Sequence, residues 1–329
     1  MRSIPILAAA ALAVSVCSAI VAQTRTVALT IDDLPFVPAD DTRPISPLDG
    51  KAASAANRKL LRALARHKVP VTGFVIQKSV EGLGPASGPA ILRMWTQQGF
   101  DLGNHTYSHP DFNDLTVEQF EDQIARGEAT LVPTMAAAGR KAEFFRFPFN
   151  HTGDTAEKHN LVAGFLAQRG YRLAPCTIEN SDWMFDAVYG RMLARGDRAS
   201  AARLRADYLA FTASQIDYFS KLNAQVWGYE PPQIMLIHDN RLNAETIEDM
   251  LSLFEKRGFR WVTLSQAELD PAYGLPETVV TRYGPMWGYR WARERGVKVD
   301  GSLEPDPPKW IGDYGKRTPA PPPHSRSKF

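Results

Sequence analysis

The sequence predicts an α/β fold, an irregular seven-stranded (β/α) barrel. Short runs rich in β-branched and aromatic residues alternate with segments of helical periodicity over most of the chain. Sustained alternation of this kind is typical of a parallel sheet, and seven repeats favour a barrel over an open sheet. The seven expected strands are residues 26–31, 69–76, 99–104, 143–147, 171–178, 233–238 and 259–264.

Apolar residues recur at helical spacing between these strands. The clearest helical segments are residues 53–68, 116–132 and 199–225. Thr116 and Gln119 stand at the spacing of a capping box, which indicates where the second of these helices begins.

The composition is that of an ordinary globular protein. The chain has 329 residues, of which 44% are hydrophobic and 22% charged, so it can bury a substantial core. Its 38 Lys and Arg residues and 36 Asp and Glu residues are spread along the sequence and give a formal charge of +2. We therefore expect neither nucleic acid nor an anionic membrane surface as a partner. The oligomeric state is unknown from the sequence.

Residues 1–22 indicate a secretory signal peptide. Arg2 precedes an apolar run at residues 4–16, and small residues follow, including Ala19 and Ala22. The run is shorter than the roughly 20 apolar residues that span a bilayer, so we expect cleavage rather than an uncleaved anchor. The sequence thus predicts export to a periplasm or the extracellular space, with no stable membrane insertion after cleavage.

The two cysteines cannot pair within the expected mature chain. Cys17 lies in the signal peptide and Cys176 stands alone after it. No partner base is readable beside Cys176, so we interpret it as a small buried hydrophobic residue rather than a nucleophile.

Residues 26–270 are expected to form the catalytic barrel. Residues 271–315 form an aromatic-bearing extension, and the Pro-rich residues 316–329 are expected to be a disordered tail. The extension carries three tryptophans, which either pack on the barrel, as we expect, or form a sugar-stacking surface: Trp287, Trp291 and Trp310.

Titratable residues follow five of the expected strands where each strand ends. In barrels of this kind, chemistry collects on the loops after the carboxyl ends of the strands. These side chains are therefore expected to meet around one site. They are Asp32 and Asp33 after the first strand, His105 and His109 after the third, Arg146 at the end of the fourth, Asp182 after the fifth and His238 at the end of the sixth.

His105 and His109 are four residues apart, a spacing that brings two imidazoles to one side of a helical turn. Pro110 disfavours helical geometry at His109, so we expect the pair on a tight turn or a short helix after the strand. With one carboxylate they form a ligand set that suits zinc and leaves a position open for water. Of Asp32 and Asp33, one can bind the metal while the other acts as a base. The residues alone do not decide which does which, nor do they separate zinc from cobalt, nickel or manganese.

Five short motifs resemble those of the polysaccharide deacetylases of the NodB-homology type, carbohydrate esterase family four. The resemblance covers roughly residues 26–270 and implies the (β/α) barrel of that family. In chain order the motifs are Thr30-Ile31-Asp32-Asp33, His105-Thr106-Tyr107-Ser108-His109, Arg146-Phe147-Pro148-Phe149, Glu179-Asn180-Ser181-Asp182-Trp183 and Leu236-Ile237-His238.

The resemblance implies roles for the first three motifs. Asp33, His105 and His109 bind a divalent metal, and Asp32 is the general base. Arg146 holds Asp32 charged and oriented, which suits the fixed fork of a guanidinium group.

The resemblance also implies roles around the acetyl group. His238 is the general acid that protonates the departing amine, and Asp182 raises the pKa of that histidine. The metal and a backbone N–H near Phe149 stabilise the oxyanion. Trp183 and Leu236 line the pocket for the acetyl methyl group.

Three positions depart from the family motifs. Ile31 replaces an aromatic residue, Phe149 replaces Tyr, and Glu179 replaces Asp. None removes an expected ligand, base or acid. The departures indicate a divergent branch whose substrate can differ, and the sequence assigns no role to Glu179.

The sequence therefore predicts an exported, metal-dependent hydrolase that removes N-acetyl groups from an amino-sugar polysaccharide or oligosaccharide, chitin-like or peptidoglycan-like. Two alternatives keep the site and change the substrate: an O-acetyl esterase on a glycan such as xylan, and an amidase on a small amide. A third alternative is a catalytically inactive glycan-binding protein.

Overall fold

The computed structural model describes residues 24–37 and 50–317. The expected signal peptide lies outside this part of the chain, as does the tail from residue 318 onward. Residues 316 and 317, which the sequence analysis placed in that tail, belong to helix α12 (Lys309–Arg317). Among the described residues, no helix combines the length and apolar character needed to cross a membrane.

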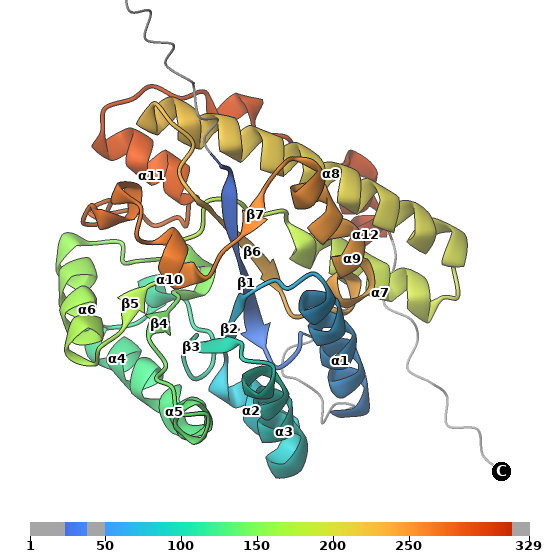
Figure 1. The fold of residues 1–329 in the computed structure, drawn as a ribbon, viewed down its shortest axis with the longest axis horizontal. Helices are drawn as coiled ribbons and strands as arrows, with labels where there is room; N and C mark the ends of the chain where they lie inside the picture. Colours follow the sequence, from blue (N-terminus) through green and yellow to red (C-terminus); the bar gives the residue numbers. More distant parts are fainter. Residues whose placement is uncertain (1–23, 38–49, 318–329) are drawn as a thin grey trace, which may run out of the picture.

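A curled parallel sheet forms the centre of the molecule (Figure 1). Its strand order is β5-β4-β3-β2-β1-β6, and β7 pairs with the beginning of β1. Each strand lies within or overlaps one of the expected runs, so the prediction of a seven-stranded α/β fold is confirmed for the described residues. The strands are β1 (Thr26–Leu34), β2 (Val71–Val75), β3 (Asp101–Asn104), β4 (Phe144–Phe145), β5 (Arg172–Leu173), β6 (Gln233–His238) and β7 (Arg260–Trp261).

The segment after β5 closes the ring of strands by a short contact with β6 rather than by a full ladder of hydrogen bonds. The expected strand at residues 171–178 is divided, because β5 ends at Leu173 and Pro175 has no N–H to continue a ladder. The chain then reaches β6, where Thr177 N donates to Ile234 O at 2.9 Å and Leu236 N donates to Ile178 O at 2.9 Å. The sheet is therefore an irregular barrel, as expected.

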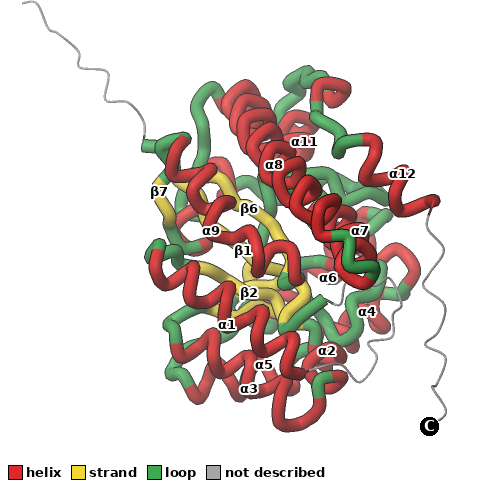
Figure 2. Tube along the Cα trace, turned by 90° about the vertical axis from the view of Figure 1, so that its right-hand side faces the viewer, coloured by secondary structure: helices red, strands yellow, loops and turns green. Residues whose placement is uncertain are grey.

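Helices surround the sheet (Figure 1). Figure 2 shows the long helix α8 running along one side, next to α9 and α11. The helices are α1 (Gly50–Arg66), α2 (Gln77–Gly82), α3 (Gly84–Gln97), α4 (Val117–Arg126), α5 (Glu128–Ala137), α6 (Ala156–Gln168), α7 (Asp182–Ala194), α8 (Arg198–Trp227), α9 (Arg241–Lys256), α10 (Leu264–Ala267), α11 (Trp287–Glu294) and α12.

The expected helix at residues 116–132 is two helices. Its start is as predicted, because Thr116 and Gln119 form a capping box at the beginning of α4. Gly127 ends α4 and precedes α5. A β-carbon at Gly127 would lie 2.5 Å from Asn104 Oδ1, so the glycine allows this helix boundary to approach the end of β3.

The core is built around β1, which is buried from Val27 to Leu34. Apolar residues of the strands and surrounding helices pack into one main cluster with it. Trp287 and Trp291 of the extension belong to that cluster and are 5% and 3% exposed, so neither ring is available for stacking on a sugar. Trp310 packs against a second cluster formed by α7 and α8.

Candidate active site

The carboxyl ends of the strands surround a cavity of about 650 Å³. The register of the sheet explains this convergence, since Asp32 on β1 pairs with His238 on β6. Arg146 and Asp182 are buried directly behind the cavity wall. The other expected site residues line the cavity: Asp32, Asp33, His105, His109, Phe149, Trp183, Leu236 and His238.

A distortion at the end of β1 turns the two aspartates toward this cavity. The pairing of β1 with β2 shifts register between Ile31 and Leu34, and Asp33 adopts a left-handed conformation with φ of 64°. Such a conformation costs of order 1–3 kcal/mol for a residue other than glycine. It allows both adjacent carboxylates to approach His105 instead of pointing to opposite faces of the sheet.

Asp33, His105 and His109 form a compact group of metal-ligand atoms. Asp33 Oδ1 lies 3.5 Å from Nε2 of each histidine, and the ligand atoms all lie within 4.8 Å of one another. Ligands bound tetrahedrally to zinc at about 2.1 Å are roughly 3.4 Å apart. The donor set and its spacing therefore fit a divalent metal such as zinc.

Further hydrogen bonds orient the two histidines of this group. His105 Nδ1 donates to the backbone carbonyl of Arg146 at 2.8 Å, which fixes the ring with Nε2 directed toward Asp33. Of the tight turn and the short helix expected for His105 to His109, the structure has a non-helical turn. Thr106 and His109 both have positive φ, and Thr106 Oγ1 accepts the backbone N–H of His109 at 3.0 Å.

The charge of Asp33 is stabilised by its histidine neighbours. Burial acts to raise its pKa, but the charge of His109 and the hydrogen bond and charge of His105, together with His238, hold the pKa well below its usual range. An ionised carboxylate in this position suits a metal ligand.

Asp32 is held from one side by Arg146. Arg146 Nη1 lies 3.2 Å from Asp32 Oδ1 and also donates to Thr30 Oγ1 at 2.9 Å. The guanidinium is fully buried, and its remaining donors contact the carbonyls of Ala174 and Pro175. The contact of Arg146 with Oδ1 thus sets the orientation of the Asp32 carboxylate. The other oxygen, Oδ2, lies 3.8 Å from His105 Nε2.

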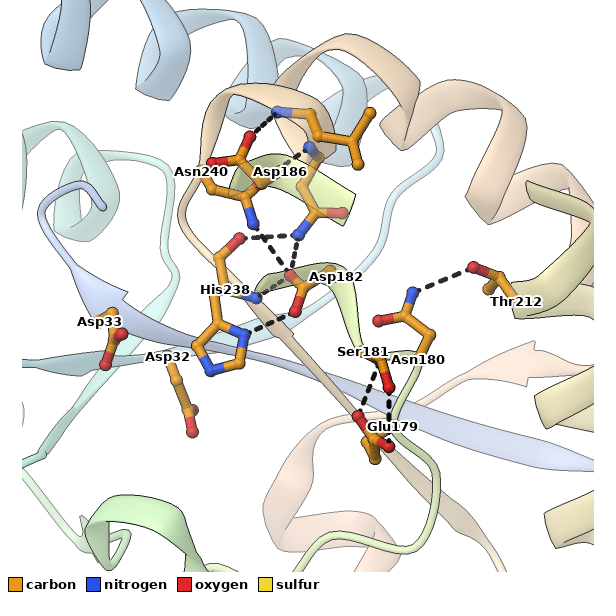
Figure 3. Close-up of polar contacts among 12 residues, drawn as sticks. Asp32, Asp33, Glu179, Asn180, Ser181, Asp182, Asp186, Thr212, His238 and Asn240 are labelled. Carbon is orange, nitrogen blue, oxygen red and sulfur yellow. Dashed lines mark hydrogen bonds and ion pairs between the residues drawn. The ribbon is translucent and has the colours of Figure 1, made fainter. Parts of the chain in front are cut away.

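On the neighbouring strand β6, His238 is paired with Asp182 (Figure 3). Its Nδ1 lies 2.7 Å from Asp182 Oδ1, which leaves Nε2 as the ring nitrogen available to the cavity. Burial opposes the charged ring, but the charge and hydrogen bond of Asp182, aided by the two aspartates of β1, raise the pKa of His238 to about 10.

The Asp182 carboxylate has further donors that the sequence analysis missed. Its Oδ2 accepts the side-chain amides of Asn240 and Asn243. Tyr208, from the middle of α8, donates to Asn243 Oδ1 at 2.5 Å. Asn240 also caps helix α9, as an Asn at a helix start commonly does, but no sequence signal relates Asn240 or Asn243 to Asp182.

Two aromatic side chains stand at the cavity mouth. Phe149 and Trp183 are 53% and 59% exposed, whereas Leu236 is buried in the wall. The Phe149 ring lies 4.6 Å from the ring of His109, between centroids.

Glu179 also lines the cavity, and its Oε2 accepts the backbone N–H of Ser181 at 2.8 Å. Burial raises the pKa of this carboxyl group. Cys176 is fully buried, and burial raises the pKa of its thiol to about 11, consistent with a packing residue rather than a nucleophile.

The fold and the site define a barrel protein with a candidate His-His-Asp metal centre beside two buried charge pairs. Residues 20–167 match the sequence model of the polysaccharide deacetylase family, so the resemblance expected from the motifs is confirmed over that part of the chain. This match includes the metal-ligand group and Arg146, while Asp182 and His238 lie beyond it.

Two curated relatives are similar to part of this chain. The chain is 25% identical over 125 residues to a peptidoglycan-N-acetylglucosamine deacetylase of Bacillus cereus, covering 38% of this chain and 40% of the relative. It is 28% identical over 139 residues to a chitooligosaccharide deacetylase of Sinorhizobium fredii, covering 41% of this chain and 59% of the relative. Each match thus spans less than two thirds of the relative's length.

The crystal structure of a mutant carbohydrate esterase family four pseudoenzyme superimposes with a TM-score of 0.50 and 17% identity. It covers 75% of this chain and 68% of that chain. At this identity the likeness concerns the fold, and it supports the curled parallel barrel described above.

Proposed function

We propose that the protein is an exported, metal-dependent hydrolase that removes N-acetyl groups from an amino-sugar polysaccharide or oligosaccharide, chitin-like or peptidoglycan-like. The observation that carries the proposal is the meeting of three groups in one cavity. They are the metal-ligand group, the Asp32–Arg146 pair and the His238–Asp182 pair. The named activities of the two relatives support a deacetylation reaction.

A divalent metal bound by Asp33, His105 and His109 supplies Lewis-acid polarisation of the acetyl carbonyl and lowers the pKa of water. Zinc is the first choice for this ligand set, with cobalt, nickel and manganese as alternatives. The attacking water gives its proton to Asp32, whose orientation is set by Arg146. The water oxygen adds to the carbonyl carbon.

Breakdown of the adduct needs an acid. His238 donates its Nε2 proton to the amide nitrogen as the C–N bond breaks, and the products are acetate and a free amine. Asp182 keeps Nδ1 protonated and holds the ring in place. A backbone N–H near Phe149 stabilises the negative oxygen.

The surroundings of this chemistry suit an acetylated sugar. Leu236 is buried in the cavity wall and offers apolar contact to an acetyl methyl group. Phe149 and Trp183 present exposed ring surface at the mouth, where the apolar face of a sugar ring can pack.

The raised pKa of His238 favours amide over ester hydrolysis. An amine leaves poorly unless its nitrogen is protonated, so a histidine that retains its proton at neutral pH is suited to this step. An O-acetyl esterase acting on a glycan such as xylan is the second candidate, because the same groups can attack an ester carbonyl.

The test is acetate release by the zinc-loaded full-length protein. N-acetylglucosamine oligomers, acetylated xylan and a small N-acetyl amide are compared, with Asp32→Asn as the inactive control. We expect release from the oligomers. Release from xylan alone would contradict the amide proposal, and release from none of them would favour a glycan-binding protein without activity.

A further inference from the structure

We propose that the C-terminal extension is part of the active site. Arg290 holds the loop of residues 147–152 in the conformation that presents its backbone N–H to the substrate oxygen, and Gly284 lets the extension lie against that loop. This inference rests on the proposed function. It makes Arg290 a positioning residue outside the five motifs and outside residues 20–167.

The loop of residues 147–152 has a backbone conformation that its own hydrogen bonds do little to stabilise. Phe149 and Asn150 are consecutive residues with φ of 58°. This left-handed backbone conformation is unfavourable for residues other than glycine. Internal hydrogen bonds are few: Asn150 N donates to Phe147 O, and His151 N donates to Pro148 O, both at 3.1 Å. A conformation of this kind persists when neighbouring structure holds it.

Arg290 of helix α11 provides such a contact. Its guanidinium is fully buried; Nη2 donates to Asn150 O at 2.7 Å and Nη1 donates to Thr152 Oγ1 at 3.0 Å. The first acceptor is the carbonyl of the second left-handed residue. The planar fork of an arginine thus joins two points of the loop, which a lysine cannot reproduce.

The arginine is itself fixed on the side of the extension. Its Nη1 lies 2.9 Å from Glu277 Oε1, and its Nε donates to Pro285 O at 3.1 Å. The guanidinium carbon lies 4.6 Å from the centre of the Trp287 ring. Because a buried charge needs such partners, the contacts make Arg290 a rigid support for the loop.

Gly284 shows how closely the extension approaches. A β-carbon at this position would lie 1.8 Å from Phe149 O, so any side chain would displace the loop. Gly284 does not have a positive φ, so the glycine is required by space rather than by backbone conformation. Gly284 and Met286 also line the cavity, as do Phe149 and Asn150.

A backbone hydrogen bond joins the extension to the strand end that supports Arg146. Trp287 N donates to Cys176 O at 2.9 Å, and Cys176 directly follows the two carbonyls that accept from Arg146. Cys176 Sγ in turn donates to Asn150 Oδ1 at 3.3 Å. The extension, the loop and the wall behind Asp32 are therefore one connected unit.

The experiment compares Arg290→Met and Gly284→Ala in the full-length protein with two matched controls. Arg295→Met removes an exposed arginine that contacts Val226 O on α8 rather than the loop. Gly301→Ala adds a β-carbon that meets only the side chain of Tyr289, at 3.6 Å or more. Zinc content, melting temperature, kcat, KM and amide hydrogen exchange of the peptide covering residues 147–152 are measured for each.

We expect kcat to fall about a hundredfold in both loop variants, with KM and zinc content nearly unchanged, because a misplaced oxyanion donor acts on the transition state. Hydrogen exchange in residues 147–152 should increase, and both controls should match the wild type. If Arg290→Met fails to fold, Gly284→Ala carries the test alone.

Two results would overturn the inference while leaving the proposed function intact. One is wild-type kcat in the folded, zinc-loaded loop variants, and the other is a loss of kcat without any change in exchange of the loop. A wild-type protein that releases no acetate would instead contradict the proposed function. The exchange measurement would then decide separately whether Arg290 holds the loop.

Discussion

Oδ1 of Asp182 lies 2.7 Å from Nδ1 of His238, and Oδ2 of the same carboxylate accepts the backbone N–H of His238, also at 2.7 Å. One carboxylate thus contacts the histidine at two points. The contact orients the ring and keeps its proton against the opposing effect of burial. The behaviour of this pair with pH follows from that arrangement.

We expect the metal-free protein to lose stability as the pH rises from about 6.5 to about 10. The pKa of His238 is raised from an ordinary value near 6.5 to about 10, so the stabilisation by its charged form is complete below about pH 6.5 and is lost as the pH rises through about 10. Asp182→Asn should flatten this dependence. Urea unfolding of both proteins across the range measures it, and parallel curves would contradict the pairing.

Replacing Asp32 and Asp33 one at a time distinguishes their roles. Asp32→Asn should keep the metal and lower kcat by roughly 10²–10⁴-fold, because it removes a general base. Asp33→Asn should lose metal, because it removes the ligand oxygen 3.5 Å from both histidines. Metal content after dialysis and acetate release are the measurements. Metal loss in Asp32→Asn with retention in Asp33→Asn would reverse the assignment.

Removing the metal should abolish acetate release without unfolding the barrel, whose core does not depend on the ligand group. Zinc at a hundred times its Kd should raise the free energy of unfolding by about 2.7 kcal/mol. His109→Ala should abolish most of that gain. A chelated protein with an unchanged rate would show that the ligand assignment is wrong.

Arg146→Met should lower the free energy of unfolding by about 3–5 kcal/mol, since it leaves a buried carboxylate without its charged partner. The double variant with Asp32→Asn should recover part of this loss. Arg140→Met is the control, because the Arg140–Asp101 pair is partly exposed and should contribute about 0–1 kcal/mol. Equal losses for the two arginines, measured in urea, would contradict this account of Arg146.

Two tryptophans should respond in opposite ways. Trp291→Ala should cost about 3–5 kcal/mol of stability, because the ring is 3% exposed in the main core cluster. Trp183→Ala should change stability by no more than about 0.5 kcal/mol, because its side chain is largely exposed, and should instead raise KM. Thermal unfolding and steady-state kinetics on the same pair of variants provide the comparison.

Periodicity located all seven strands, because buried parallel strands and amphipathic helices have different spacings of apolar residues. It also placed the site residues, since parallel strands bring their carboxyl ends to one edge. Periodicity did not predict where an expected strand or helix is interrupted. The ending of β5 before Pro175 and the division at Gly127 depend on where the chain must approach a neighbour, which spacing does not report.

The contacts behind the site were also beyond sequence reasoning. Asn243, Tyr208 and Arg290 look like ordinary helix residues, and their importance arises from helices α8, α9 and α11 packing next to the strand ends. The positive φ of Asp33 was likewise unreadable, because the register shift that produces it belongs to the pairing of β1 with β2.

The central position of β1 has a consequence for the order in which the molecule is made. Thr30 and Met235, joined by a hydrogen bond between β1 and β6, are 205 residues apart in the chain, and Asp32 is paired with His238 in the same ladder. The ribosome synthesises β1 long before β6, and contacts between residues so distant in the sequence form slowly. Gly284 and Met286 line the cavity as well, so a nascent chain that ends before them already carries Asp33, His105 and His109 but lacks part of the cavity wall.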